Sequence, residues 1–181
     1  MVNPGDILIA KPFLQDNYFK RSVIYMVEHS ESGSLGFIVN KPNHLKLNDV
    51  LPHLKHANFP LFEGGPVSTD QLFYTHTLGS KLSNSIEISE GVYWGGNFFE
   101  LSILIENREL DENDIRFYIG YSGWSAHQIE TEIERDKWFV QSAEYKSIIS
   151  AHSDDLWGDE LIKINEGFKA FSDFNFDPSL N

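Results

Sequence analysis

Ser122 lies between two glycines in the stretch GYSGW, residues 120–124, which raises the possibility of a serine nucleophile. A nucleophile elbow follows the pattern G-x-S-x-G, because small residues relieve crowding where a strand turns into a helix. Here Trp124 occupies the position of the last glycine. We therefore expect residues 120–124 to form a tight turn that packs its tryptophan against the core, and we do not expect a hydrolase centre.

A second candidate for chemistry is His29, which follows Glu28 at the end of a predicted strand. Neighbours in a strand point to opposite faces, so Glu28 cannot be the partner of His29, which would have to be Asp16 or Asn40. Polar residues at strand ends often border a pocket in α/β sheets, which would bring Arg21 into the same site. The competing interpretation gives the imidazole a purely structural hydrogen bond.

Two further motifs give weaker indications of a binding site, one for an anion and one for a metal. Gly64 and Gly65 in FEGGPVSTDQ could cradle an anion, but the phosphate-loop pattern is missing and Asp70 would repel a phosphate, so a sharp turn is favoured. His53 and His56 are spaced for one helical turn, yet zinc needs a third ligand and no H-E-x-x-H is present. We expect neither a metal nor a cofactor.

Composition restricts the class of protein. A chain of 181 residues with 41% hydrophobic residues is long enough for one domain with an ordinary core. It has no cysteine, so no disulfide contributes to stability. It contains no apolar run long enough to cross a bilayer, and its N-terminus lacks the features of a signal peptide. We expect a cytoplasmic protein.

The charge balance restricts the partners. Lys and Arg number 14 against 27 for Asp and Glu, a net charge of −13. Such a chain is repelled by nucleic acids and anionic lipids unless it carries a strong basic patch. The densest basic run covers only residues 19–21, with Lys11 nearby. We expect a protein or a small molecule as partner, with no direct nucleic-acid contact and no membrane.

The order of predicted elements suggests how these residues are positioned. Residues 6–11, 22–29 and 35–41 are rich in Ile and Val and read as three adjacent strands. The apolar run at residues 23–27 predicts a central strand buried on both faces. Residues 46–54 predict one short helical turn that ends near Pro52. Further strands are predicted at residues 71–78, 85–89 and 114–121 and at the stretch KWFVQS.

Helices are expected mainly in the second half. Asn97 and Glu100 have the spacing of a capping box before a helix at residues 98–106. Ser125 and Gln128 have the same spacing, before a helix that would turn Ala126, Ile129 and Ile133 to the sheet and Glu130, Glu132, Glu134 and Arg135 to solvent. From about residue 144 the chain is expected to be helical, with a frayed tail at residues 172–181.

Several sequence blocks in order resemble the AlgH/YqgE family of bacterial proteins over residues 5–158. Matching positions are Gly5, Leu8, Ile9, Ala10, Pro12, Asp16, Phe19, Val23, Glu28, His29, Gly36, Asn40, Pro42, Gly64, Gly65, Pro66, Val67, Gly120, Tyr121, Gly123, Trp124, Gln128, Glu130, Glu132, Ile133 and Trp138. The resemblance implies an α/β (α+β) fold, a single domain at residues 1–181 with a curled, barrel-like sheet flanked by helices. It implies no established activity, although one relative is named as a transcriptional regulator.

Two functional interpretations follow. The favoured one is a non-enzymatic binding or regulatory module with an exposed aromatic patch around Tyr93, Trp94, Trp124 or Trp157. The alternative is an enzyme of unknown reaction, with a polar pocket around His29, Asp16, Arg21 and Asn40. The candidate pocket positions are Asp16, Arg21, His29, Asn40, Gly64, Gly65, Ser122, Trp124 and Gln128.

Overall fold

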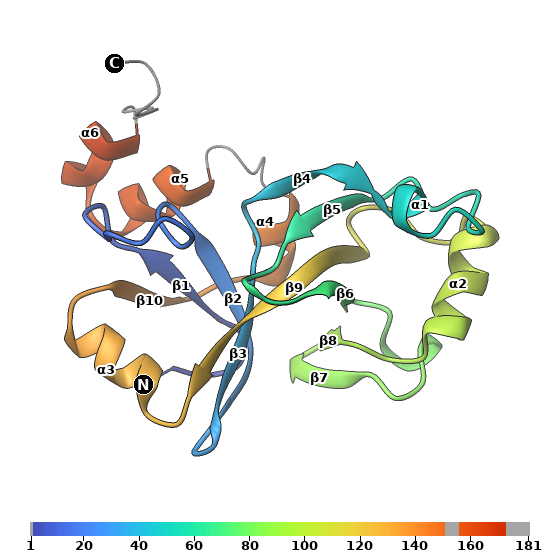
Figure 1. Ribbon diagram of the computed structural model, residues 1–181, viewed down its shortest axis with the longest axis horizontal. Coiled ribbons are helices and arrows are strands. Elements are labelled where there is room, and N and C mark those ends of the chain that lie inside the picture. The colour runs from blue at the N-terminus through green and yellow to red at the C-terminus, as the bar shows by residue number, and fades with distance from the viewer. Residues whose placement is uncertain (1, 151–155, 173–181) are drawn as a thin grey trace.

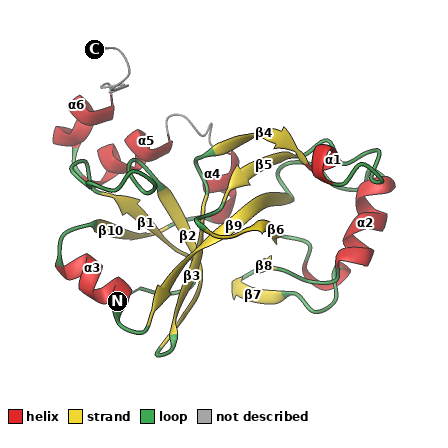
Figure 2. Ribbon diagram, in the orientation of Figure 1, coloured by secondary structure: helices red, strands yellow, loops and turns green. Residues whose placement is uncertain are grey.

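The computed structural model describes residues 2–150 and 156–172, which form one mixed α+β domain (Figures 1 and 2). A single ten-stranded sheet runs through it, and β5 with β9 is the one parallel pair among the described strands. The strands are β1 (Asp6–Ala10), β2 (Val23–Ser30), β3 (Gly33–Ile38), β4 (Pro42–Lys46), β5 (Pro60–Glu63), β6 (Val67–His76), β7 (Ile86–Ser89), β8 (Val92–Trp94), β9 (Ile115–Ser125) and β10 (Trp138–Ser142).

The sheet is open. Its main path runs β10-β1-β2-β3-β9-β6-β8-β7, and β4 and β5 branch from it, with β5 paired to β9. The end strands β10 and β7 do not pair with each other, so the expected curled, barrel-like closure is wrong. Closing a barrel requires one continuous ring of neighbours. Here β9 divides one of its edges between β5 and β3, and the sheet branches at that point.

The N-terminal strands agree with the sequence prediction. β1, β2 and β3 are successive antiparallel neighbours. The first five residues of β2 are buried, and β2 has a strand on each side, as expected of a central strand. Its apolar run therefore packs against both faces of the sheet.

The predicted tight turn at residues 120–124 is wrong, because β9 continues through it to Ser125. Gly120 has a φ of +69°, and opposite it the β6–β9 register breaks between Val67 and Leu72. A bulge therefore absorbs the irregular backbone while the strand goes on. The actual reversal comes at Ala126 and His127, and His127 has a left-handed φ of 58°.

The helices were predicted with uneven accuracy. α2 (Phe98–Glu106) has the expected bounds, and Asn97 Oδ1 accepts from the N–H groups of Phe99 and Glu100. The Glu100 carboxylate, however, accepts from the backbone and hydroxyl of Ser83. The remaining helices are α1 (Leu47–Val50), α3 (Gln128–Glu134), α4 (Tyr145–Ser150), α5 (Leu156–Ile164) and α6 (Lys169–Ser172), with 3₁₀ turns at Gly79–Lys81 and Glu166–Phe168.

Most helices lie toward the two ends of the sheet, and α4 lies behind its middle (Figure 1). α5 lies beside β1, where the Trp157 indole donates to the Ala10 carbonyl oxygen at 2.7 Å. α2 lies at the opposite end, on a second buried cluster that includes Leu101, Ile105 and Phe117. The predicted frayed tail falls, apart from Ser172, outside the described residues. No helix in the described ranges has the length and hydropathy to span a membrane.

Candidate functional site

The four polar residues of the enzymatic interpretation lie at opposite ends of β2. Asn40 Oδ1 accepts from the Val23 N–H, and Asn40 Nδ2 donates to the Arg21 carbonyl oxygen, both at 2.8 Å. His29 lies six residues further along β2, about 20 Å at 3.3 Å per residue. The structure therefore does not bring Asn40 and His29 together.

Each of these side chains has local partners. His29 Nδ1 is 2.8 Å from Ser34 Oγ, and His29 Nε2 is 3.4 Å from Glu130 Oε1. Asp16 Oδ1 accepts from two backbone N–H groups in the turn that follows it. The Arg21 guanidinium stacks on the Trp157 ring at 4.3 Å. Asp16, Arg21 and Asn40 thus bind their own neighbourhood at the start of β2, away from His29.

Ser122 is fully buried and structural in its contacts. Its Oγ donates to the Gly64 carbonyl oxygen at 3.0 Å. A Cβ at Gly64 would lie 2.2 Å from the Gly120 oxygen, and one at Gly65 would lie 2.0 Å from the Tyr121 carbonyl carbon. The glycine pair therefore permits close backbone contact with β9, and the serine closes that contact with a hydrogen bond.

Trp124 and Gln128 converge on a residue that the sequence analysis assigned to solvent. The Trp124 and Trp138 indoles both donate to Glu132 Oε2, at 3.1 and 2.9 Å. Gln128 Nε2 and Lys137 Nζ lie 3.3 and 3.2 Å from Glu132 Oε1. The Glu132 side chain is only 16% exposed, so its predicted solvent-facing role is wrong.

The electrostatics of Glu132 follow from these contacts. Burial alone would raise the pKa of its carboxyl group, because the charged form loses water. The hydrogen bonds from Trp138, Trp124, Gln128 and Lys137 outweigh burial and hold the pKa below its ordinary value. Glu132 is therefore an ionised acceptor that fixes α3 against β9 and β10, and its oxygens are occupied.

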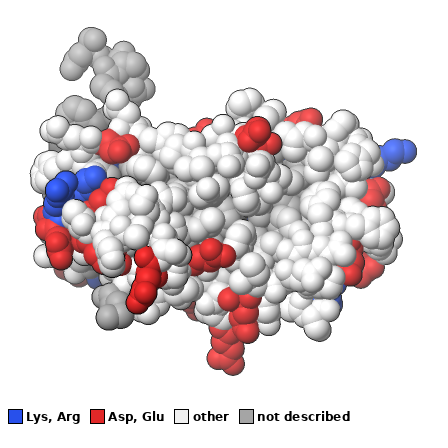
Figure 3. Space-filling view, turned by 60° about the horizontal axis from the view of Figure 1, so that its bottom comes forward, with Lys and Arg blue, Asp and Glu red and all other residues white. Residues whose placement is uncertain are grey.

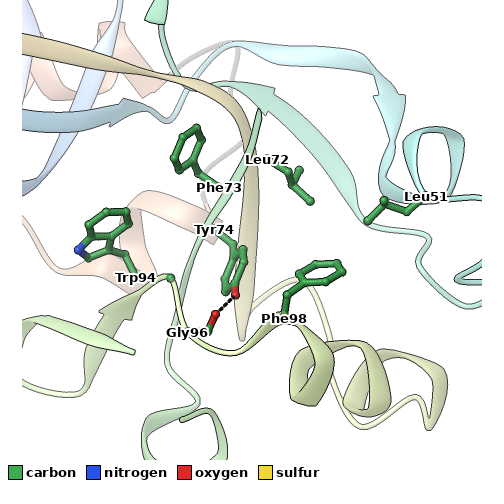
Figure 4. A pocket seen from close by; sticks show the side chains of 8 residues that line it. Leu51, Leu72, Phe73, Tyr74, Trp94, Gly96 and Phe98 are labelled. Atoms are coloured by element: carbon green, nitrogen blue, oxygen red, sulfur yellow. Dashed lines mark hydrogen bonds between the residues drawn. The ribbon is translucent and has the colours of Figure 1, made fainter. Parts of the chain in front are cut away.

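An apolar pocket of about 430 Å³ lies at the other end of the molecule, between β6 and the start of α2 (Figure 4). Three consecutive β6 residues line it, and their side chains alternate between the two faces of the sheet. A pocket can touch both faces only where it straddles the edge of a strand. The lining residues are Leu51, Leu72, Phe73, Tyr74, Trp94, Gly95, Gly96 and Phe98.

This edge of β6 is open because the chain leaves the sheet at the end of β8. β8 pairs with β6 only at Thr75 and His76, and the Gly95 N–H donates to the Tyr74 carbonyl oxygen. Gly95 and Gly96 then take φ values of +66° and +111°, which turn the chain away toward α2. Within the described residues, no strand covers β6 before Tyr74 on this side.

The backbone of Leu72 faces that open edge. Leu72 pairs with Ile119 of β9, but the Ile119 carbonyl oxygen accepts from Gly64 on the other side of β9. Leu72 and Ile119 are therefore a non-hydrogen-bonded pair, and the N–H and C=O of Leu72 point away from β9. Tyr74, two residues on, turns its carbonyl oxygen the same way, toward Gly95.

Polar groups near the pocket are used internally. The Tyr74 hydroxyl donates to the Gly96 carbonyl oxygen at 2.7 Å, and burial raises its pKa to about 12 (Figure 4). His76 is fully buried behind it, with Nε2 3.0 Å from the Gly95 oxygen and Nδ1 accepting from the Leu78 N–H. Desolvation lowers the pKa of His76, so its neutral form holds this wall of the pocket.

Little of this pocket could be predicted from the sequence. Trp124 and Trp157, two of the four residues expected in an exposed aromatic patch, are buried at 6% and 3% exposure. Trp94 does line the pocket. The stretch YWGGNF carried the available signal, since two glycines between aromatic residues mark a backbone that leaves a strand.

A second depression borders Trp124 but is polar. Its lining is rich in serine and glycine from the β2–β3 hairpin and the end of β9, and it includes Glu28 but not His29. Since neighbouring strand residues face opposite ways, the two side chains open on different sides of the hairpin.

Comparison with known proteins agrees with the fold. The AlgH-like family model matches residues 7–168. A UPF0301 protein of Bacteroides thetaiotaomicron is 38% identical over 98% of this chain and 90% of its own length. One from Cytophaga hutchinsonii is 36% identical over the full length of both.

Two solved structures resemble this fold. A crystal structure of a Corynebacterium diphtheriae protein gives a TM-score of 0.79 at 23% identity, with 96% of this chain and 93% of that chain covered. The solution structure of the AlgH protein from Pseudomonas aeruginosa gives 0.75 at 27% identity, with 90% and 88% covered. The family match over most of the sequence and these relatives show that the chain belongs to the AlgH-like, UPF0301 family.

Proposed function

We propose that this protein is a non-enzymatic binding module of the cytoplasm, and that any regulatory role is exercised through a partner held in the apolar pocket beside β6. The observation that carries the proposal is the position of the pocket at an uncovered strand edge, lined by both faces of β6. Concave apolar sites with few polar groups are the usual form of ligand and partner sites.

The distribution of exposed apolar residues supports this site. Six large hydrophobic side chains are exposed among the described residues: Phe13, Val50, Val67, Ile86, Phe99 and Ile103. Val50 precedes the lining residue Leu51, and Phe99 and Ile103 lie on α2, which begins at the lining residue Phe98. Single exposed hydrophobic residues are common on any protein surface. Exposed apolar side chains on α1 and α2, the elements beside the pocket, support an interaction surface there.

The lining favours binding over catalysis. Tyr74 is the only titratable side chain among the eight lining residues, and its pKa of about 12 keeps it protonated at neutral pH. A general acid or base needs a pKa near the working pH. We therefore assign the pocket to recognition, with a protein or small molecule as partner. The net charge of −13 argues against nucleic acid.

Site-specific photo-crosslinking in cells tests the proposal. A photoreactive phenylalanine analogue replaces Phe98 in the pocket, and the control carries it at Phe13, a 79% exposed aromatic residue outside the pocket. We expect one defined adduct from position 98 that is absent from position 13. Adding Leu72→Arg, which places a charge in the pocket, should abolish it. No adduct, or the same adducts from both positions, would contradict the proposal.

A further inference from the structure

We infer that the partner is an extended peptide segment that adds as a strand to the open edge of β6, with a basic and apolar sequence. This inference rests on the proposed function, because it names the occupant of the same pocket.

Leu72 presents the backbone groups that an added strand would bind. Leu72 turns its N–H and C=O to the open side, and the Tyr74 carbonyl oxygen on the same side already binds Gly95. In an antiparallel ladder, two opposite residues exchange both of their N–H to C=O hydrogen bonds. The N–H and C=O of Leu72 could form such a pair with one residue of an added strand. Peptides that add to sheet edges gain affinity from such main-chain bonds and specificity from pockets for alternate side chains.

The pocket fits an apolar side chain of that strand. Leu72 itself lines it, and Trp94 and Phe98 lie on opposite sides of Tyr74 (Figure 4). If one peptide residue bonds to Leu72, the side chains of successive peptide residues would point alternately above and below the sheet. One apolar side chain would enter the pocket, and the bulge between Val67 and Leu72 would end regular pairing on the other side.

Charge selects the remaining side chains. Residues 67–106 supply seven of the eight lining residues, and there the one Lys or Arg is Lys81, against the acidic residues Asp70, Glu87, Glu90, Glu100 and Glu106. Lys55 lies four residues after Leu51, the eighth lining residue. On the face shown in Figure 3, Lys and Arg side chains are visible only toward the margins, whereas Asp and Glu are spread across it. Asp70 is exposed on β6 itself, two residues before Leu72. Complementary charge favours a cationic peptide.

Capped hexapeptides of alternating sequence test the inference with the full chain. The probes are a Lys/Val peptide, a Glu/Val peptide, and two Lys/Val isomers N-methylated on every valine or on every lysine. Each methylated isomer keeps donors along one edge only. We expect the Lys/Val peptide to bind at least tenfold more tightly than the Glu/Val peptide, and to slow amide exchange at Leu72 at least tenfold.

The methylated pair gives the sharpest readout. A strand that pairs through one edge should lose at least tenfold in affinity with one isomer and keep its affinity with the other. Asp70→Lys should reduce Lys/Val binding and leave the fold intact, since Asp70 is exposed. Equal binding of both isomers and the unmethylated peptide would overturn strand addition, and no effect of Asp70→Lys would overturn the preference for a basic peptide.

The two proposals fail in different ways. If crosslinking at position 98 gives a Leu72-dependent adduct but none of the peptides binds, the pocket remains a recognition site and the peptide inference is wrong. If crosslinking also fails, the proposed function is wrong as well.

Discussion

Ser122 Oγ donates a hydrogen bond to the carbonyl oxygen of Gly64, 3.0 Å away, and thereby joins β9 to the segment that follows β5. The same carbonyl oxygen accepts from the Ile38 N–H at the end of β3. One oxygen thus links three strands at the point where β9 changes its neighbour from β5 to β3. The most enzyme-like residue of the sequence is part of the branch point of the sheet.

Ser122→Ala should therefore reduce stability without affecting recognition. The loss of one buried hydrogen bond costs about 1 kcal/mol, because the Gly64 oxygen keeps its bond from Ile38. Denaturant unfolding measures this change. A fluorophosphonate probe of serine nucleophiles should not label the folded wild-type protein, since Ser122 is fully buried. Stoichiometric labelling at Ser122 would show that the structural assignment is wrong.

Glu132→Gln should destabilise the protein by about 2 kcal/mol at pH 7, because hydrogen bonds to a charged acceptor are stronger than neutral ones. Folding lowers the pKa of Glu132 below its reference value of 4.5. The folded state therefore binds this proton less readily than the unfolded state. The stabilisation is present above about pH 4.5 and is lost as the pH falls through the folded pKa.

Urea unfolding of wild type and Glu132→Gln from pH 7 to below pH 4.5 tests the direction of this pH dependence. The difference between them should shrink as the medium becomes more acidic, since the amide resembles the protonated acid. Glu134→Gln is the matched control, because Glu134 lies on the same helix and is exposed. A constant difference, or an equal loss in Glu134→Gln, would remove Glu132 as the anchor of α3.

Gly65→Ala should cost about 3 kcal/mol or more, since its Cβ would lie 2.2 Å from the Ser122 nitrogen, within a rigid backbone contact. Gly91 provides the comparison. Its φ is +73° and nothing lies within 4 Å of a Cβ there, so Gly91→Ala should cost only the backbone strain, about 1–2 kcal/mol. Thermal unfolding measures the loss of stability in each variant. Equal losses in Gly65→Ala and Gly91→Ala would show that position 65 does not require glycine for close backbone contact.

The local elements could be predicted because their signals are local. α2 starts where Asn97 caps it, and β2 is buried as its apolar run indicated. The tight turn at residues 120–124 failed for a non-local reason. Gly120 has the backbone of a turn, but the Val67–Tyr121 pair and the partners on β3 hold residues 121–125 in the sheet.

The separation of the candidate site residues was already contained in the predicted strands. Asp16 and Arg21 precede the strand predicted at residues 22–29, and His29 ends it. The antiparallel β2–β3 pairing then returns Asn40 to the start of β2. Glu132 was assigned to solvent by its place on the helix, and the two indoles that bury it come from β9 and β10. The pocket beside β6 needed knowledge of where β8 stops pairing.

His76 provides a pH test of the pocket wall. Leu78 donates its N–H to Nδ1, which leaves the proton of the neutral ring on Nε2, where it can be donated to the Gly95 oxygen. Protonation of Nδ1 would place its N–H against the Leu78 N–H, so that two donors would face each other. Desolvation by burial also lowers the pKa of His76 below 6.5. Because the unfolded chain takes up this proton first, the stabilisation is complete above about pH 6.5 and is lost as the pH falls toward the folded pKa.

Uptake of one proton changes the free energy of unfolding by at most about 1.4 kcal/mol per pH unit. His76→Gln keeps an N–H donor near the Gly95 oxygen and removes the titration, so its stability should change less than that of wild type between pH 7.5 and 5.5. His53→Gln, at an exposed position, should follow wild type. If His76→Gln keeps the full wild-type slope, protonation of His76 is not what loosens this wall, and the neutral imidazole has no special part in holding Gly95 at the open edge of β6.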